Sequence, residues 1–306
     1  MKKVNILILG GAGFIGSFTS KKLKQLGYNV LVIDNLSTGR IENVDNKINF
    51  KKGDIGNFKF IDVVFKKFKP NYVYNFAFNV LVPKSIENPT LEIKSIKDHL
   101  LILDLCKKYK VKKIIFPSTG FVYGNIHNNK KIKENDPISL ENPYSIAKFT
   151  AEKFTIYYSL KFDLDYTILR YAAIYGPGQV TGAMSDYIRC AKKKLPCDFW
   201  GKSKTRDYVF IDDVVRANIM CLQKKSSKKI FNIGTGISTS LPDLYLKICK
   251  ILNSPNKPIF HKEKIGEQNN YKLNSSLALK KLNWKPKISL KKGLLETINY
   301  HIQNKL

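Results

Sequence analysis

Short apolar runs alternate with segments of helical periodicity along the first part of the chain. Six runs have the length and composition of buried strands. Between them, apolar residues recur every three or four positions, which is typical of helices with one buried face. Strands that alternate with helices form a parallel sheet covered on both faces, so the pattern predicts an α/β fold with a doubly wound sheet. The expected strands span residues 4–9, 29–33, 48–50, 72–76, 113–116 and 166–171, and the expected helices are one that ends at Gly27 and others over 58–68, 92–109 and 144–161.

The pattern changes after about residue 172. Helices and short strands continue, but loops are longer and prolines are more frequent. We therefore expect two units: a larger one over residues 1–172, and a smaller α/β lobe over 173–306 that covers the ligand, with a strand or helix exchanged between them. No apolar run approaches the ~20 residues of a membrane-spanning helix, and the first residues do not resemble a signal peptide.

The composition adds a strong positive charge. Lysine and arginine number 53 against 24 aspartates and glutamates, which gives a net charge of +29 over 306 residues. A basic surface can bind nucleic acid, but nearly all of these cations are lysine rather than arginine, which nucleic-acid sites use for bidentate contacts. We interpret the lysines as a solvated surface that helps to attract an anionic substrate, and we expect no nucleic-acid partner.

The cysteines argue against a metal site. There are five, an odd number, and no pair has the Cys-x-x-Cys spacing of a zinc site. We expect reduced thiols in a cytoplasmic protein, with neither disulfides nor a bound metal.

A glycine motif follows the first expected strand. Gly10, Gly13 and Gly16 stand between this strand and the next helix, where glycines permit a tight turn and a close approach of the backbone to a pyrophosphate. Asp34, at the end of the second strand, is positioned to accept hydrogen bonds from both ribose hydroxyls and to repel a 2′-phosphate. The motif therefore predicts a Rossmann-type domain that binds NAD in preference to NADP, with Asp54 near the adenine.

A tyrosine and a lysine share one face of the helix over 144–161. Tyr144 and Lys148 are four residues apart, so they lie one helical turn from each other. An ammonium near a phenol favours the phenolate, which predicts that Lys148 lowers the Tyr144 pKa and makes Tyr144 a general acid–base. Ser118 and Thr119, just after the fifth strand, supply hydroxyls at the same edge of the sheet.

Together these motifs resemble the extended short-chain dehydrogenase/reductase family, and within it the NAD-dependent nucleotide-sugar epimerases and dehydratases. The resemblance covers nearly the whole chain. Its motifs are Gly10 to Gly16, Asp34 to Gly39, Gly53 to Ile55, Ser85 to Pro89, Ser118 to Gly124, Asn142 to Lys148, Leu169 to Tyr171, Tyr175 to Pro177, Thr205 to Tyr208, Asn232 to Gly236 and Leu282 to Pro286.

The resemblance implies a role for each matching residue. Thr119 and Tyr144 would hydrogen-bond the C4 hydroxyl of a sugar, and Tyr144 would remove its proton while C4 gives a hydride to NAD. Lys148 would hold the nicotinamide ribose, and Arg206 would pair with the nucleotide diphosphate. The implied substrate contacts are Phe78, Thr119, Phe121 and Arg206, and the implied cofactor contacts are Gly10, Gly13, Phe14, Ile15, Gly16, Asp34, Asn35, Ser37, Asp54, Ile55, Phe76, Ala77, Tyr144, Lys148 and Tyr171.

The residues after Thr119 bear on the reaction. Dehydratases of this family carry an Asp-Glu pair there, whereas this chain has Gly120 and Phe121, which cannot move protons. This favours C4 epimerisation through a transient 4-keto sugar, with 4-keto-sugar reduction or dehydration as the alternatives. A nucleotide-sensing or RNA-binding protein is a further alternative, against which the intact Tyr-x3-Lys motif speaks.

Several positions depart from the family pattern. Ala173 replaces an asparagine that contacts the diphosphate, Asn270 stands where a second arginine is expected, with Lys272 nearby, and Ser95 replaces an asparagine on the cofactor side. Bulky side chains at Phe78 and Phe121 reshape the sugar pocket. The sugar and the nucleotide base therefore stay open.

The resemblance also implies a partner and a pathway. Helices near 94–109 and 145–161 correspond to the pair that forms a homodimer interface in the family, although their apolar faces are equally compatible with a monomer core. The expected pathway makes a surface polysaccharide or a glycolipid.

Overall fold

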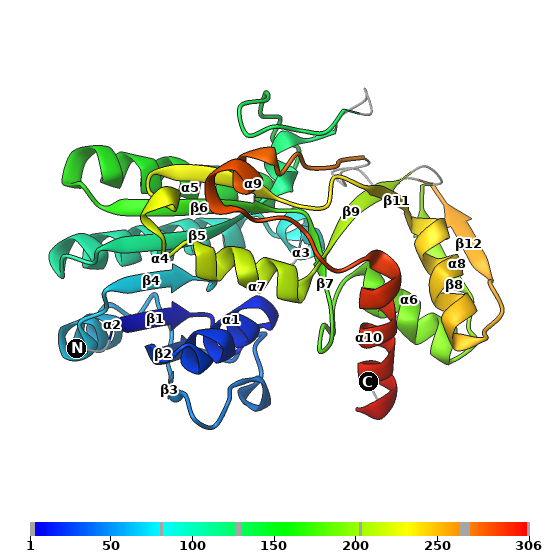
Figure 1. Cartoon of the computed structure of the whole chain (residues 1–306), viewed down its shortest axis with the longest axis horizontal. Helices are drawn as coiled ribbons and strands as arrows, with labels where there is room; N and C mark the ends of the chain where they lie inside the picture. Colours follow the sequence, from blue (N-terminus) through cyan, green and yellow to red (C-terminus); the bar gives the residue numbers. More distant parts are fainter. Residues whose placement is uncertain (1–3, 80–81, 126–129, 202–203, 263–269, 305–306) are drawn as a thin grey trace.

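A parallel sheet of seven strands forms the centre of the molecule (Figure 1). The computed structural model describes residues 4–304, except 80–81, 126–129, 202–203 and 263–269. The strand order is β10-β6-β5-β4-β1-β2-β3, so the chain leaves β1 in one direction and returns to its other side at β4. Ligands of such sheets bind at this switch point. The strands are β1 Asn5–Leu9, β2 Asn29–Asp34, β3 Asn49–Lys52, β4 Tyr72–Asn75, β5 Lys113–Thr119, β6 Asp165–Tyr171 and β10 Lys229–Ile233.

Helices cover both faces of this sheet. In β1, Ile6 and Ile8 pack towards α1, α7 and α9, whereas Leu7 and Leu9 pack towards α2, α4 and α5. Because both faces are buried, every core position of the strand is apolar, which explains the continuous apolar runs of the sequence. The helices are α1 Phe14–Gln25, α2 Phe58–Phe68, α3 Val82–Glu87, α4 Thr90–Lys108, α5 Pro143–Phe162, α7 Ile211–Met220 and α9 Ser276–Leu282, with 3₁₀ turns at Ile41–Asn43, Gly120–Tyr123 and Lys224–Ser226.

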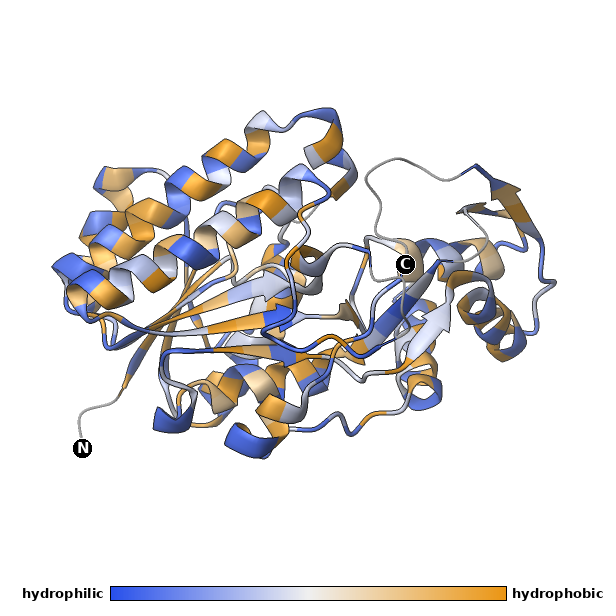
Figure 2. Ribbon diagram, turned by 90° about the horizontal axis from the view of Figure 1, so that it is seen from above, coloured by the Kyte–Doolittle hydropathy of each residue, from blue (hydrophilic) through white to orange (hydrophobic). Residues whose placement is uncertain are grey.

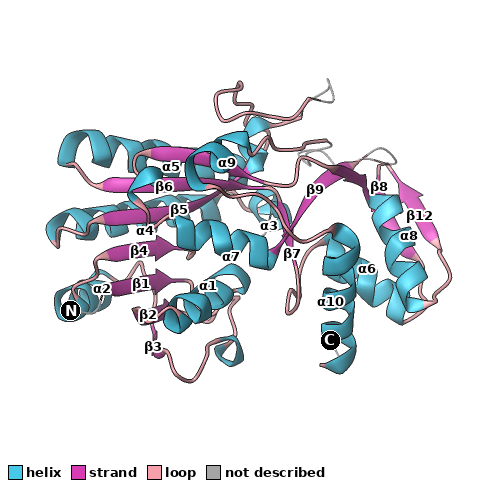
Figure 3. Ribbon diagram, viewed as in Figure 1, coloured by secondary structure: helices cyan, strands magenta, loops and turns pink. Residues whose placement is uncertain are grey.

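A second lobe lies beyond the carboxyl ends of the strands (Figure 3). It has its own core, in which the rings of Tyr187, Phe199 and Tyr245 lie 5.0 to 5.8 Å apart. Its strands form two small sheets, β11-β9-β7 and β12-β8. The elements are β7 Ala173–Tyr175, α6 Ala183–Lys192, β8 Cys197–Trp200, β9 Thr205–Phe210, β11 Ser238–Ser240, α8 Leu241–Leu252, β12 Pro258–His261 and α10 Leu290–Gln303.

The two parts of the chain are interwoven. Strand β10 follows the second lobe's first elements in sequence, yet it pairs with β6 at the edge of the large sheet. Helix α7 packs on α1, and the Tyr74 hydroxyl on β4 donates to the Asn218 carbonyl of α7 at 2.8 Å. The boundary at residue 172 stays a prediction, but elements on either side of it share one core.

The predicted fold class is confirmed, and most predicted elements lie within a few residues of their positions. Strand β5 is longer than expected and continues through Pro117 to Thr119. Its pairing with β4 ends at Ile115, so Pro117 needs no N–H on that side, while β6 still pairs with it. Helix α3 was not predicted. Along the other helices, hydrophobic and hydrophilic residues alternate (Figure 2), and none of the helices in the described ranges is long and apolar enough to cross a membrane.

Candidate active site

The carboxyl ends of five neighbouring strands meet at the edge of the sheet that faces the second lobe (Figure 1). Gly10 follows β1, Asp34 ends β2, Asp54 follows β3, Phe76 follows β4 and Thr119 ends β5. The parallel topology thus gathers residues that are far apart in the sequence along one edge of the sheet, the place where folds of this topology have their ligand crevice.

The glycine loop brings backbone close to backbone. Gly10 has a φ of +75°, and a Cβ built there would lie 2.6 Å from the Ala77 nitrogen. A Cβ at Gly16 would lie 2.3 Å from the Gly10 carbonyl oxygen. Helix α1 starts at Phe14 without a side-chain cap, so its first N–H groups point into the loop. Only glycine fits these positions, and the result is a cradle suited to an anion.

Asp34 is buried at the end of β2 beside this cradle. Its Oδ2 accepts a hydrogen bond from the Ala12 nitrogen at 2.9 Å, and its Oδ1 accepts one from the Leu36 nitrogen at 2.8 Å. Each carboxylate oxygen has a further lone pair for a ribose hydroxyl. The bonds to the backbone fix the carboxylate at the mouth of the loop.

Asp54 lies on the neighbouring loop and is tied to its surroundings. It accepts hydrogen bonds from Gly56 N at 2.8 Å and from the Asn35 side chain at 3.0 Å, and it pairs with Lys94 at 3.3 Å. Partial burial opposes ionisation, but these hydrogen bonds outweigh it and lower the Asp54 pKa. Asn35 also accepts from the Ser37 nitrogen, which orders this segment.

The other expected cofactor contacts lie along the same edge, with one difference. Phe76 stacks on Tyr74, and Ile55 is buried below Asp54. Phe14 and Ile15 begin α1 and pack partly against the second lobe's core. The Tyr171 side chain, in contrast, points into the core, where its hydroxyl donates to Asn218, so its backbone is the part left to face a cofactor.

Tyr144 stands in the first turn of α5, at the start of a firmly capped helix. The Asn142 side chain accepts a hydrogen bond from the Ser145 nitrogen at 2.8 Å, and the Ser145 side chain accepts one from the Asn142 nitrogen. Pro143 occupies the first turn. A side-chain hydrogen bond joins Tyr144 to Thr119 at the end of β5. Two of the expected catalytic residues therefore meet directly.

Lys148 lies one turn further along α5 in an apolar setting. Its Nζ donates to the Pro117 carbonyl at 2.8 Å and lies 4.1 Å from the centre of the Phe78 ring and 4.9 Å from that of Phe116. The Tyr144 ring centre is 5.9 Å from the same nitrogen. The third expected catalytic residue thus joins the other two, held by one carbonyl and by aromatic faces.

The Tyr144 pKa is shifted in the opposite direction from the one predicted from the sequence. Burial lowers the Lys148 pKa to about 7, although Glu92 and Glu152 oppose this shift. Burial and the Glu92 carboxylate raise the Tyr144 pKa, and the hydrogen bond with Thr119 only partly offsets them. A lysine that is only partly protonated at neutral pH stabilises a phenolate weakly, so the predicted lowering of the Tyr144 pKa is wrong.

Ser118 and Thr119 have separate tasks. The Ser118 hydroxyl donates to Glu152, whose carboxylate also receives two bonds from Arg170, at 3.0 Å from Nε and 2.6 Å from Nη2. All three of these side chains are buried. Ser118 is thus committed to a buried ion pair that braces α5 against β6, which leaves Thr119 as the hydroxyl of the site.

Aromatic side chains line the part of the crevice next to the second lobe. The Phe121 ring lies edge-on to Tyr144 at 6.3 Å and to Tyr271 at 5.7 Å. The Arg206 guanidinium, on β9, lies 5.9 Å from the centres of both the Phe121 and Tyr271 rings. Asn270 accepts from Thr205 beside Arg206, so it supports this strand. The expected substrate residues therefore cluster around the tyrosine.

Sequence reasoning missed two members of the site. Tyr271 comes from the loop before α9, and no motif marks it as part of the aromatic group. Glu92, in the first turn of α4, is buried and acts electrostatically on both Lys148 and Tyr144. The one sequence signal for Glu92 was a charged residue between two apolar ones, Leu91 and Ile93, in the first turn of a helix.

The chain matches a family model described as the NAD dependent epimerase/dehydratase family over residues 6–234. The chain belongs to this family. It is 34% identical to a putative UDP-glucose 4-epimerase from Methanocaldococcus jannaschii, with 98% of this chain and 99% of that protein covered. The predicted family is therefore confirmed.

Solved structures agree with this assignment. A UDP-glucose 4-epimerase from Thermotoga maritima, crystallised with UDP-glucose, superposes with a TM-score of 0.95 at 34% identity over 99% of this chain and all of that one. A Thermus thermophilus UDP-glucose 4-epimerase in complex with NAD gives a TM-score of 0.93 at 28% identity over 97% and 98% of the two chains. The predicted cofactor, NAD, is confirmed, and the glycine cradle and Asp34 fit it.

Proposed function

We propose that this protein is an NAD-dependent nucleotide-sugar 4-epimerase. The observation that carries the proposal is the cluster of Thr119, Tyr144 and Lys148 beside the glycine cradle. A hydroxyl, a phenol and an amine at the end of one crevice are the groups needed to take a proton from an alcohol carbon that gives up a hydride.

The side chains have distinct tasks in this reaction. Thr119 and Tyr144 hold the C4 hydroxyl of the sugar, and Tyr144 takes its proton as the C4–O bond becomes a carbonyl. The glycine cradle and Asp34 would hold NAD, which would supply reversible hydride transfer at C4. Tyr144 then returns the proton to the oxygen, so no cofactor is consumed. Lys148 lies next to Tyr144, and its protonated amine stabilises the Tyr144 phenolate.

Two residues support epimerisation over elimination of water. Gly120 and Phe121, directly after Thr119, carry no group that could donate or accept a proton. Reduction of a 4-keto sugar uses the same three residues, and it differs from epimerisation in consuming one reduced cofactor per product.

The substrate class follows from the second lobe. Arg206 supplies a cation beside the Phe121 and Tyr271 rings, suited to a diphosphate, and the two rings supply apolar faces for a sugar. The similar proteins named above act on UDP-glucose, which makes UDP-sugars the first substrates to test. We further propose a role in making a surface polysaccharide. We place the protein in the cytoplasm, a reducing compartment in which its five cysteines would stay unpaired.

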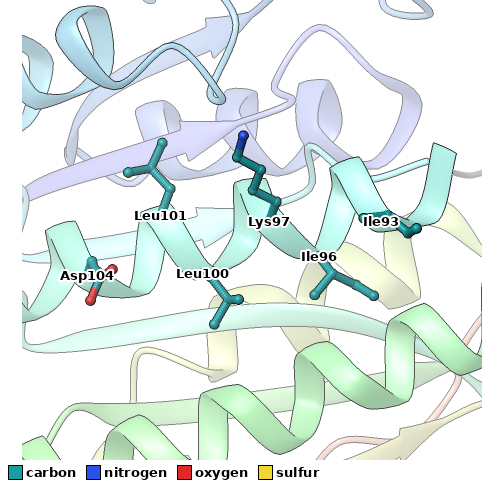
Figure 4. Close-up of a pocket in the computed structure, with 6 residues that line it drawn as sticks. All are labelled: Ile93, Ile96, Lys97, Leu100, Leu101 and Asp104. Carbon is teal, nitrogen blue, oxygen red and sulfur yellow. The ribbon is translucent and has the colours of Figure 1, made fainter. Parts of the chain in front are cut away.

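We also propose a homodimer through α4 and α5. Figure 4 shows Ile93, Ile96, Leu100 and Leu101 along α4, where they line a shallow apolar hollow with Lys97 and Asp104. A second hollow on α5 includes Phe149, Phe154 and Tyr157. Ile93 is 67% exposed and Leu160 on α5 is 80% exposed, which is costly unless another surface covers them. Light scattering of the purified protein tests the dimer.

One experiment decides between the reactions. The purified protein is incubated with a panel of UDP-, GDP-, CDP- and dTDP-sugars, and the products are analysed by NMR. We expect interconversion of C4 epimers without net change in NAD. Stoichiometric loss of NADH or NADPH with a keto sugar would assign the protein as a reductase, and no turnover of any sugar would contradict the proposal.

A further inference from the structure

Glu92 is a buried carboxylate with an incomplete set of hydrogen bonds. Glu92 lies in the first turn of α4 and is only 3% exposed. The Asn79 side chain donates to Oε1 at 2.6 Å, while Oε2 is buried and accepts no hydrogen bond from any described residue. Burial raises the Glu92 pKa, and Asn79 and Lys148 counter this shift. A carboxylate kept in such a place needs a compensating charge.

Lys148 is the cation available to it. Among the described residues, its Nζ donates to the Pro117 carbonyl and lies near two aromatic faces. None of these groups carries a full negative charge. The electrostatic partners of Lys148 of opposite sign are Glu92 on α4 and Glu152 on its own helix. Helices α4 and α5 pack side by side, and Phe78, whose ring centre lies 4.1 Å from the Lys148 nitrogen, precedes Asn79, which donates to Glu92. The carboxylate and the amine therefore lie in the same buried region.

The other charged and titratable groups around Lys148 are already committed. Glu152 is bonded twice by Arg170 and once by Ser118, so its charge is largely neutralised. His99 on α4 contacts Asn75 and Thr155 through its two ring nitrogens, and burial, together with the Lys148 charge, lowers its pKa to about 3, so it is neutral. Tyr144 is also neutral because its pKa is raised. Glu92 is therefore the uncompensated anion next to this lysine.

We propose that Glu92 is a positioning residue that favours the protonated form of the buried Lys148 amine. Desolvation favours the neutral amine, and the Glu92 charge favours the ammonium. The same carboxylate holds the proton on Tyr144, so the site pairs one anion with a partly protonated lysine and a neutral phenol. The charge pairing stands independently of the reaction, whereas its effect on turnover rests on the proposed function.

The test reads the Lys148 titration directly. The protein is labelled with [13Cε]lysine, the Lys148 signal is assigned by its loss in Lys148→Met, and its chemical shift is followed from about pH 5.5 to about pH 10. The midpoint is expected near 7 in the unmodified protein. Glu92→Gln keeps a polar group for Asn79 but removes the charge, and it should lower the midpoint by at least about half a unit. Glu87→Gln, an exposed glutamate at the end of α3, is the matched control and should leave the midpoint unchanged.

The outcomes separate this inference from the proposed function. If Glu92→Gln fails to fold, Glu92→Asp withdraws the same charge by one methylene and should lower the midpoint by a smaller amount. A midpoint that moves no more than in the control overturns the inference. The pH profile of kcat/KM provides a second measurement, since its alkaline limb should fall with the Lys148 midpoint. A shifted midpoint in a protein that turns over no sugar supports the inference and removes the proposed function.

Discussion

Backbone atoms form one end of the crevice, and side chains form the other. The cofactor end is mainly backbone, with Gly10 and Gly16 in van der Waals contact with main-chain atoms and Asp34 fixed by two backbone N–H groups. The end that we propose for the substrate is made of side chains, namely Phe121 after β5, Arg206 on β9 and Tyr271 before α9.

This difference predicts how each end responds to change. A cradle of backbone tolerates no added atom, because nothing around it can move without shifting the chain. A surface made of side chains tolerates substitution of a single aromatic ring while the fold stays intact. Substitutions at the first end should therefore weaken or alter dinucleotide binding, and substitutions at the second should change which sugar nucleotide binds.

The largest effect is expected where the two ends meet. Tyr144→Phe removes the hydroxyl that exchanges the proton but keeps the ring beside Phe121, so turnover should fall by at least ~100-fold while NAD still binds. Steady-state rates and calorimetric titration with NAD measure the two properties. Tyr157→Phe, a half-exposed tyrosine on the same helix, serves as the control. Near-normal turnover in Tyr144→Phe would remove the tyrosine from the reaction.

The next effect tests the backbone cradle. Gly10→Ala places a Cβ 2.6 Å from the Ala77 nitrogen, and overpacking of about 2 kcal/mol corresponds to a loss of about 30-fold in NAD affinity. Gly27→Ala is the matched control, since Gly27 also has a positive φ, +88°, but a Cβ there meets no atom within 4 Å. It should cost roughly 1 kcal/mol of stability and leave NAD affinity unchanged. Equal losses of affinity in both variants would mean that backbone strain, and not close approach, governs the site.

A smaller effect is expected for the choice between cofactors. Asp34→Ala removes the carboxylate that accepts from ribose hydroxyls and repels a 2′-phosphate, so the preference for NAD over NADP should fall about tenfold, or about 1.4 kcal/mol. Dissociation constants for both dinucleotides provide the measurement. Asp163→Ala, on a fully exposed turn, is the control. An unchanged preference would show that Asp34 serves only to bind Ala12 and Leu36.

The same contrast explains what could be predicted from the sequence. Glycine spacing and the Tyr144–Lys148 pair are local patterns whose geometry follows from one turn or one helix, so the glycine cradle and the closeness of Tyr144 and Lys148 were predictable. Tyr271 and Glu92 reach the site only through tertiary packing of α9 and α4, which no local pattern specifies. The direction of the Tyr144 pKa was misjudged for the same reason, because it depends on burial and on a carboxylate from another helix.

The smallest effect, and the one most informative about the substrate, is expected at the aromatic wall. Phe121→Ala removes a ring that contacts both Tyr144 and Tyr271, and an aromatic pair is worth about 0.5–1.5 kcal/mol. The KM of the best sugar nucleotide should therefore change by about twofold to tenfold, with NAD affinity unchanged. Phe58→Ala, an exposed phenylalanine on α2, controls for loss of a ring as such. Measured across the sugar panel, the variant should accept bulkier sugars than the unmodified protein does. If instead NAD affinity fell with KM, the two ends of the crevice would be one coupled unit, and the separation of backbone cradle from side-chain wall would not hold.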